Sequence, residues 1–341
     1  MGINWRLWSG GGGLAVVVRQ SLPDNRNIDS THHSSPPPPM SFERVLILAG
    51  WVVCLVAAPT SAADRPVRQL DVRYATDDDP LHTADITTPI GPPPRGGYPV
   101  VLVIHGGAWI SGDKWTMTGF TRRLADAGMV AVAMNYRLAP AHPFPHQIDD
   151  ARLALRWIAQ QSSERNWAAD RIGVWGYSAG AQIALVAATA DPSTGETTRW
   201  ANDDPRWAEI PPVQAVVGGG APCEFRTLPP GNRSLSYWLG GTRQQRGDVY
   251  AAASPAAHLD ANDPPILLLH GTADVIVPVQ SARSMTQAAK IAGAKLELKE
   301  YVGDGHVSTF TNGNVLREAV EFLRQRLAKP MNPPDVPDYQ R

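Results

Sequence analysis

Apolar and polar positions follow two different periods along the chain from about residue 67 onward. Short runs with almost no polar side chain, at 98–104 and 130–134, have the composition of strands that are buried on both faces of a sheet. The longer segment 147–161 repeats apolar residues every three or four positions, which is typical of a helix with one apolar face. Strands that alternate with helices predict a parallel sheet covered by helices on both faces.

The same two periods predict the remaining elements. The segments 69–74 and 81–88 are expected to be edge strands. Between 218 and 259 neither period persists, and we expect a cap-like insertion at 219–259 with one short helix at 234–239. Its Trp238 and Tyr250 are open to two interpretations, substrate selection or ordinary packing. The other predicted strands lie at 171–175, 213–217, 265–271 and 296–301, and the other helices at 116–127 and 181–188.

The first 63 residues do not continue this pattern. Residues 1–39 contain polyglycine and polyproline runs, and they are expected to be a disordered leader or an upstream extension assigned in error. Met40 opens a segment in which apolar or glycine residues at 45–58 precede small residues up to Ala63. This is the pattern of a secretory signal peptide at 40–63, cleaved near Ala63, and it predicts a periplasmic or extracellular protein with its folded domain at 64–341. An uncleaved membrane anchor is the alternative, although 45–58 is shorter than the roughly 20 residues of a spanning helix.

A Gly-x-Ser-x-Gly sequence at 176–180 stands between a predicted strand and a predicted helix. A serine on such a sharp turn has its hydroxyl clear of both elements, with the helix N-terminus beneath it. Glycines on both sides allow the backbone to turn that tightly. Ser178 is therefore the candidate nucleophile, and it requires a base to take its proton and a carboxylate to orient that base.

Two later loops supply these groups. Asp274 and His306 each follow a predicted strand, at the edge where an open parallel sheet places its ligands. The order Ser178, Asp274, His306 is the order found in α/β-hydrolases. The alternatives are that Asp274 caps the next helix and that His306 is a surface histidine. Asp304 is a rival carboxylate, but it lies only two residues from His306 and cannot easily brace the imidazole from behind.

The segment His-Gly-Gly-Ala-Trp at 105–109 follows the apolar strand 98–104. Acyl transfer needs N–H donors directed at the developing oxyanion. We assign the oxyanion hole to the backbone N–H groups of Gly107, Ala108 and Ala179. His105 is expected to fix this loop by hydrogen bonding. A phosphate-binding turn is the alternative, but the spacing of glycine and lysine that such turns carry is absent.

These motifs together resemble the α/β-hydrolase esterases. The sequence is most similar to feruloyl-esterase-like and hormone-sensitive-lipase-like carboxylesterases, over about residues 67–327, and also resembles arylformamidases and prenylcysteine methylesterases. It departs from the hormone-sensitive-lipase pattern at Ala108, Tyr177 and Ala181. The resemblance implies an α/β-hydrolase fold, with a mostly parallel central sheet, helices on both faces and a small cap insertion. It is carried by His105-Gly-Gly-Ala-Trp109, Asn135-Tyr-Arg-Leu-Ala-Pro140, Gly176-Tyr-Ser-Ala-Gly180, Tyr237-Trp-Leu-Gly-Gly241 and His270-Gly-Thr-Ala-Asp274.

The composition of the chain limits the classes of partner and ligand that we expect it to bind. The 341 residues include 31 Lys+Arg and 32 Asp+Glu, with a formal charge of −1, which argues against a nucleic-acid partner. Cys54 lies in the predicted signal, so Cys223 is expected to be the one thiol of the mature protein. We find no Cys/His cluster with the spacing of metal ligands, and we expect no metal and no cofactor.

The resulting hypothesis is a serine carboxylesterase that forms an acyl-enzyme on short-chain or carbohydrate-linked acyl esters. Trp109 and Tyr177 are the predicted substrate-binding side chains. We expect no stable membrane insertion after processing, and the oligomeric state stays open. The alternatives are an amide hydrolase of the arylformamidase type and an α/β-hydrolase that binds without catalysis.

Overall fold

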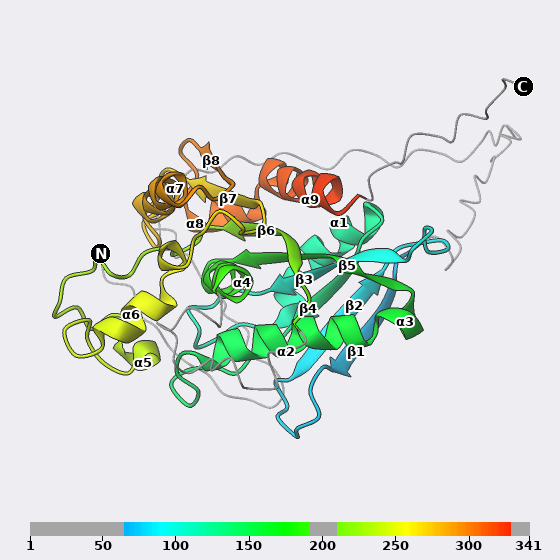
Figure 1. Cartoon of the computed structure of the whole chain (residues 1–341), viewed down its shortest axis with the longest axis horizontal. Coiled ribbons are helices and arrows are strands. Elements are labelled where there is room, and N and C mark those ends of the chain that lie inside the picture. The colour runs from blue at the N-terminus through cyan, green and yellow to red at the C-terminus, as the bar shows by residue number, and fades with distance from the viewer. Residues whose placement is uncertain (1–64, 191–209, 329–341) are drawn as a thin grey trace, which may run out of the picture. The chain divides into compact units, whose positions relative to one another are not determined.

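A computed structural model describes residues 65–190 and 210–328 of the chain. The leader at 1–39 and the signal at 40–63 that the sequence predicts lie outside these residues. Among the residues described, eight strands form one sheet in the order β1-β2-β4-β3-β5-β6-β7-β8 (Figure 1). The strands are β1 Val67–Arg73, β2 Thr83–Thr88, β3 Tyr98–Ile104, β4 Val130–Met134, β5 Trp167–Tyr177, β6 Val213–Gly219, β7 Ile266–Gly271 and β8 Leu296–Tyr301.

The sheet is parallel from β4 through β3, β5, β6 and β7 to β8, and β2 alone runs in the opposite direction, antiparallel to both β1 and β4. The predicted fold class is confirmed. One detail of the prediction is wrong, because β2 pairs with both β1 and β4 and is therefore not an edge strand. β4 pairs with β2 on the side away from β1. The local sequence does not encode this pairing.

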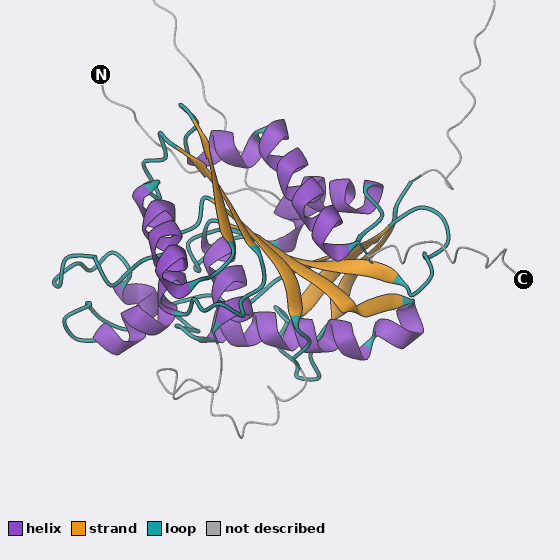
Figure 2. Cartoon of the chain, turned by 45° about the horizontal axis from the view of Figure 1, so that its top comes forward, coloured by secondary structure: helices purple, strands orange, loops and turns teal. Residues whose placement is uncertain are grey.

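Helices cover both faces of the twisted sheet (Figure 2). On one side α2 packs against α4, and on the other α1 packs against α9. The predicted helices are present with ends shifted by a few residues, and the first splits into η2 and α1. The helices are η2 Lys114–Met117, α1 Thr118–Asp126, α2 His146–Gln160, α3 Ser162–Arg165, α4 Ala179–Thr189, α5 Ser236–Leu239, α6 Gly247–Ala253, η3 Pro255–Ala257, α7 Gln280–Ala292, α8 His306–Thr311 and α9 Gly313–Leu327.

Each face of the sheet has its own apolar core. Successive side chains of a strand point to opposite faces. In β3, Val100, Leu102 and Ile104 therefore join the core beneath α2, α4 and α7, whereas Val101 and Val103 join the core beneath α1 and α9. All seven residues of β3 are buried, which explains its continuous apolar sequence.

The segment between β6 and β7 forms the predicted insertion. It contains the short helices α5, α6 and η3, and α5 lies within the predicted range 234–239. Trp238 and Tyr250 are fully buried, so these two aromatic side chains serve packing. Trp238 joins the core on the α4 face of the sheet, which attaches the insertion to the main domain.

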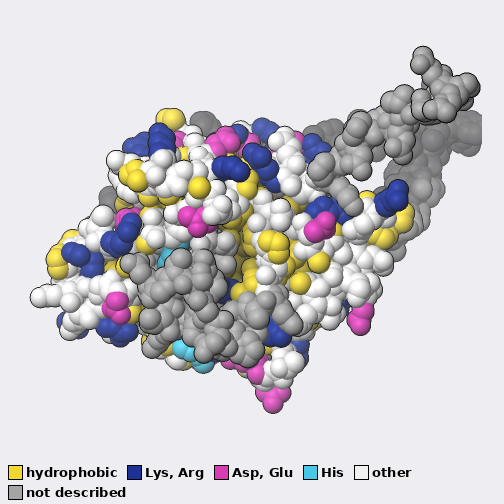
Figure 3. All heavy atoms as spheres, viewed as in Figure 1, with side chains coloured by type: hydrophobic (Ala, Val, Ile, Leu, Met, Phe, Trp, Pro, Cys, Tyr) yellow, Lys and Arg dark blue, Asp and Glu magenta, His cyan; other side chains and the backbone are white. Residues whose placement is uncertain are grey.

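The described residues contain no helix that is both long and apolar enough to cross a membrane. On the face drawn in Figure 3, basic and acidic side chains are interspersed, with no broad area of one sign. This distribution agrees with the near-zero formal charge of the chain.

Candidate active site

Ser178 stands at the junction of β5 and α4, with φ 55° and ψ −123°. The left-handed region is uncommon for a residue with a Cβ atom. Two glycines make this turn possible. A Cβ on Gly176 would lie 2.0 Å from the carbonyl oxygen of Gly180, and a Cβ on Gly180 would lie 2.3 Å from the carbonyl oxygen of Ile104. The Gly-x-Ser-x-Gly spacing therefore reflects close backbone contacts, and the predicted strand-to-helix turn is present.

His306 and Asp274 form a hydrogen-bonded pair. Nδ1 of His306 lies 2.6 Å from Oδ2 of Asp274, whose side chain is fully buried. The other oxygen of Asp274 accepts from the backbone N–H groups of Ile276 and Val277, at 2.9 and 2.8 Å. Asp274 is thus held within its own loop and does not cap α7, which begins at Gln280. The rival Asp304 accepts from the side chain of Asn312 at 2.7 Å.

Contacts of Tyr177 and Gly220 join the His306–Asp274 pair to the residues around Ser178. The N–H of Ser178 donates to the carbonyl oxygen of Gly219 at 2.8 Å. The next residue, Gly220, lies against the imidazole: a Cβ built there would be 3.0 Å from Cε1 of His306. From the other side, the hydroxyl of Tyr177 donates to the backbone carbonyl of His306 at 2.5 Å. Because Nδ1 is bonded to Asp274, Nε2 is the nitrogen of His306 that remains for a proton transfer.

His270 is a second imidazole beside the carboxylate. It is fully buried, its Nε2 lies 2.8 Å from the carbonyl oxygen of Val277, and the same nitrogen is 3.5 Å from Oδ2 of Asp274. Burial lowers the pKa of His270 and outweighs the opposing effect of Asp274. A neutral His270 donates from Nε2 and so ties Val277 to the end of β7. His270 is thus a packed residue at the end of β7.

The loop after β3 bonds to itself through its carbonyl groups. The carbonyl oxygen of Gly107 accepts from the N–H groups of Ile110 and Ser111, both at 3.1 Å. The carbonyl oxygen of Gly106 accepts from Nδ1 of His105 at 2.7 Å. His105 therefore fixes the loop as predicted, and burial lowers its pKa.

The N–H groups assigned to the oxyanion hole remain available to a ligand. In a trans peptide the N–H points away from the preceding carbonyl. The N–H of Ala108 therefore points away from the turn that holds the carbonyl of Gly107. Within the described residues, the N–H groups of Gly107, Ala108 and Ala179 donate to no backbone or side-chain acceptor. Ala108 and Ala179 both line the pocket at Ser178.

An aromatic stack joins the same loop to the insertion. The indole of Trp109 lies parallel to that of Trp238, with ring centroids 3.7 Å apart. Nε1 of Trp109 donates to Oε1 of Gln182 at 3.0 Å, and Gln182 belongs to α4. Nε1 of Trp238 likewise donates to Oε1 of Gln147 at 3.0 Å. Trp109 is thus bonded to α4, the helix that follows Ser178, and is stacked on α5.

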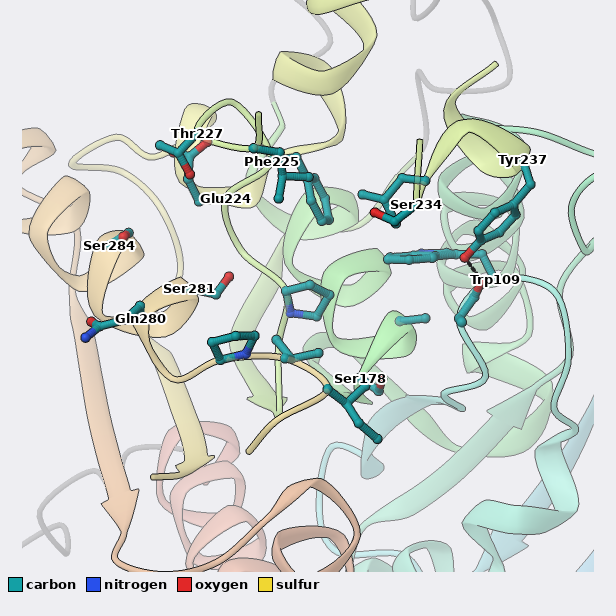
Figure 4. A pocket seen from close by; sticks show the side chains of 18 residues that line it. Trp109, Ser178, Glu224, Phe225, Thr227, Ser234, Tyr237, Gln280, Ser281 and Ser284 are labelled. Atoms are coloured by element: carbon teal, nitrogen blue, oxygen red, sulfur yellow. Dashed lines mark hydrogen bonds between the residues drawn. The ribbon is translucent and has the colours of Figure 1, made fainter. Parts of the chain in front are cut away.

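A pocket of about 450 Å³ opens at Ser178. Figure 4 shows Trp109 and Tyr237 on one side of it, and Gln280, Ser281 and Ser284 of α7 on the other. Its single acidic residue, Glu224, is paired with Arg226, which approaches its Oε2 to 2.6 Å. The full lining is Ala108, Trp109, Ser178, Ala179, Pro222, Glu224, Phe225, Thr227, Leu228, Ser234, Leu235, Tyr237, Ile276, Val277, Pro278, Gln280, Ser281 and Ser284.

The two predicted substrate-binding side chains have different positions. Trp109 lines the pocket, whereas Tyr177 is 4% exposed and packs beneath His306 and Phe310, outside the lining given above. Tyr177 therefore supports the His306 segment from below. The sequence interpretation missed Phe225 and the first turn of α7, which no motif marks. It quoted Tyr237 as part of the motif at 237–241 but gave it no place in the pocket.

The fold and this geometry define an α/β-hydrolase with a serine beside a histidine–aspartate pair. The BD-FAE family model matches residues 85–289, more than half of the chain, and the chain belongs to this family. The resemblance to α/β-hydrolase carboxylesterases that the motifs predicted is confirmed.

Two curated relatives come from Mycobacterium tuberculosis. The esterase LipC is 30% identical over 243 residues, which are 67% of this chain and 57% of LipC. The probable carboxylic ester hydrolase LipM is 32% identical over 195 residues, which are 55% of this chain and 44% of LipM. The chain thus spans about half the length of these two relatives.

Solved structures share the fold. A truncated carbohydrate esterase from gut microbiota has a TM-score of 0.70 at 22% identity, covering 79% of this chain and 99% of its own. The esterase Est2 of Thermogutta terrifontis with bound propionate has a TM-score of 0.60 at 23% identity, covering 77% and 95%. At these identities the likeness concerns the fold alone.

Proposed function

We propose that the protein is a serine hydrolase of carboxylic esters that works through an acyl-enzyme. One observation carries the proposal. In the Asp274–His306 pair, Nδ1 and Oδ2 are 2.6 Å apart, and His306 contacts Tyr177 and Gly220, which adjoin the elbow serine Ser178 between β5 and α4. Ser178 itself lines a pocket. Nucleophile, base and orienting acid are the three groups that this chemistry requires. The similarity to the esterase LipC and the probable carboxylic ester hydrolase LipM supports the ester as substrate.

The proposed mechanism assigns one role to each group. Nε2 of His306 takes the hydroxyl proton of Ser178 as the oxygen attacks the ester carbonyl. Asp274 holds Nδ1–H of the imidazole and stabilises the cation that forms. The N–H groups of Gly107, Ala108 and Ala179 bind the oxyanion. His306 then returns the proton to the departing alcohol, and water, activated by the same imidazole, releases the acid.

The substrate that we propose is a short-chain or carbohydrate-linked acyl ester. A pocket of about 450 Å³ accommodates a short acyl group together with its alcohol. Hydroxyl and amide side chains on the α7 side, Ser281, Ser284 and Gln280, offer hydrogen bonds to a polar alcohol. A structural neighbour named a carbohydrate esterase, the esterase LipC and the probable carboxylic ester hydrolase LipM agree with this class.

A substrate panel tests the proposal. It contains p-nitrophenyl esters of rising chain length, acetylated xylan, methyl ferulate and N-formylkynurenine. We expect hydrolysis of C2 to C6 esters that falls beyond C8. Preference for N-formylkynurenine would support an arylformamidase-type amide hydrolase, and preference for C12 or longer chains would indicate a lipase.

The variant Ser178→Ala is the matched control. We expect its rate to fall by roughly 10³-fold or more with the fold retained, because the nucleophile is lost while the surrounding contacts remain. A fluorophosphonate should label the wild type and not the variant. Equal labelling of both would remove Ser178 from the mechanism, and a wild type that neither hydrolyses nor labels would favour a non-catalytic binding module.

Export is proposed on the sequence alone. The segment 40–63 has an apolar run followed by small residues, the pattern of a cleaved signal. The test is N-terminal sequencing of protein recovered outside the cytoplasm. A chain that begins at Ala63 or Asp64 would support the proposal, and one that retains 45–58 would contradict it.

A further inference from the structure

Three consecutive residues of the loop after β3 have a positive φ. The angles are 123° at Gly107, 51° at Ala108 and 62° at Trp109. Glycine reaches this region freely, but alanine and tryptophan carry a Cβ atom that disfavours it. Such conformations persist only where the surrounding structure holds them. Ala108 and Trp109 therefore depend on contacts outside their own backbone preference.

Both peptide groups that flank Ala108 are held by hydrogen bonds. The carbonyl oxygen of Gly107 is bonded within the loop, to the N–H groups of Ile110 and Ser111. The carbonyl oxygen of Ala108 itself accepts from the hydroxyl of Tyr237 at 2.9 Å. With one bond on each side, φ and ψ of Ala108 are both restrained, and so is the direction of its N–H. Figure 4 draws the bond between Tyr237 and this carbonyl.

The bond to Tyr237 comes from the insertion. Tyr237 is the second residue of α5, and the third, Trp238, stacks on Trp109. One four-residue helix thus contacts the carbonyl of Ala108 and the side chain of the next residue. The ring of Tyr237 also lines the pocket. Burial raises the pKa of Tyr237, so its hydroxyl remains a donor at neutral pH and above.

We propose that Tyr237 is a positioning residue for the oxyanion hole: its hydroxyl holds Ala108 in the left-handed conformation that directs the N–H of Ala108 at the reacting carbonyl. This inference rests on the proposed esterase function. It implies that the insertion takes part in catalysis through backbone geometry, in addition to shaping the pocket. The relevant group is the hydroxyl, because phenylalanine would keep the ring and lose only the bond.

The experiment compares Tyr237→Phe with Tyr250→Phe. The hydroxyl of Tyr250 also donates to a backbone carbonyl, that of Gly241 at 3.2 Å, but this bond lies within the insertion. We expect Tyr237→Phe to lower kcat about tenfold, the effect of one neutral hydrogen bond on the population of the active loop, with KM changed less than about twofold. Tyr250→Phe should leave kcat unchanged. Equal kcat values for both variants would overturn the inference.

A rescue experiment separates positioning from a purely structural role. Glycine at position 108 adopts a positive φ without the restraint, so the effect of Tyr237→Phe should shrink when it is introduced together with Ala108→Gly. The quantity compared is the ratio of kcat with and without the Tyr237 hydroxyl, in each background. An equal ratio in both backgrounds, or a Tyr237→Phe chain that fails to fold, would contradict the assignment of the hydroxyl to loop geometry.

Failure of the proposed function would look different. In that case the wild type would neither hydrolyse esters nor react with a fluorophosphonate. The positioning role would then be read from a crystal structure of Tyr237→Phe. Loss of the positive φ at Ala108 would support it, and an unchanged φ would overturn it.

Discussion

The elbow at Ser178 and the loop at 107–109 both contribute to one pocket, and both hold residues with a Cβ atom in the left-handed region. Different structures stabilise them. The elbow depends on Gly176 and Gly180, which stand within two residues of the serine and leave no room for a side chain. The loop depends on distant partners. The comparison shows that a positive φ at a residue with a Cβ atom can be accommodated by adjacent glycines or held by hydrogen bonds from distant segments.

The partners of the loop come from three separate parts of the chain. Gln182 of α4 accepts from the indole of Trp109, Tyr237 of α5 donates to the carbonyl of Ala108, and Ala139 donates its N–H to the carbonyl of Trp109 at 2.8 Å. None of them is near 107–109 in sequence. The loop is consequently expected to respond to substitutions that are distant in sequence.

The largest effect is expected at the carboxylate that serves the elbow. Asp274→Asn should lower kcat roughly 10³-fold or more, because it removes the charge that orients and stabilises the imidazole of His306. Asp304→Asn is the matched control, since Asp304 also lies in the site loops but bonds to Asn312. Steady-state kinetics of both variants decide the matter. A larger loss in Asp304→Asn would transfer the orienting role to Asp304.

Next in size is the effect of breaking the elbow itself. Gly180→Ala places a Cβ 2.3 Å from the carbonyl oxygen of Ile104 and 2.4 Å from that of His105. These are backbone atoms, which cannot move away without a large cost in free energy. We expect the free energy of unfolding to fall by about 3 kcal/mol or more. In Gly119→Ala of α1 the new methyl group meets nothing within 4 Å. That helix should gain up to about 1 kcal/mol, and equal unfolding midpoints for the two variants would refute the close-contact account.

The smallest expected effect is a change of thermal stability with pH. It involves Arg137, in the same segment as Ala139, whose N–H donates to the loop. Arg137 approaches Oδ1 of Asp150 to 2.5 Å, and Asp150 also bonds Nε2 of His82 at 3.0 Å. Nδ1 of His82 lies 2.7 Å from Asp77. Burial opposes protonation of His82, but Asp150 and Asp77 together raise its pKa above the usual value.

The sign of the pH dependence follows from this raised pKa. Protonated His82 stabilises the fold fully below about pH 6.5, and this contribution is lost as the pH rises through the raised pKa. We expect the Tm of the wild type to fall by about 2–4 °C over that range, and His82→Asn to show a smaller change. Thermal unfolding at a series of pH values measures it. A Tm that rises above pH 6.5 in the wild type, but not in His82→Asn, would contradict the assignment.

Much of this molecule could be read from local sequence. Continuous apolar runs mark the buried parallel strands, because β3 and its neighbours have no exposed face. The glycines of the Gly-x-Ser-x-Gly motif mark the elbow, because close backbone contact excludes a side chain there. His306 and Asp274 follow strands, and parallel strands bring their carboxyl ends to one edge. These features depend on neighbours in sequence or on a general rule of sheet topology.

Tertiary structure alone decided the rest. The place of β2 inside the sheet depends on its pairing with β4, and the position of Tyr177 beneath His306 depends on a bond across 129 residues. The pocket wall formed by Phe225, Tyr237 and the start of α7 joins segments that share no motif or period. Whether a side chain lines this pocket depends on which other segments the fold places opposite it. Its partners are set by the three-dimensional path of the chain, and the linear order of residues carries no local signal of them.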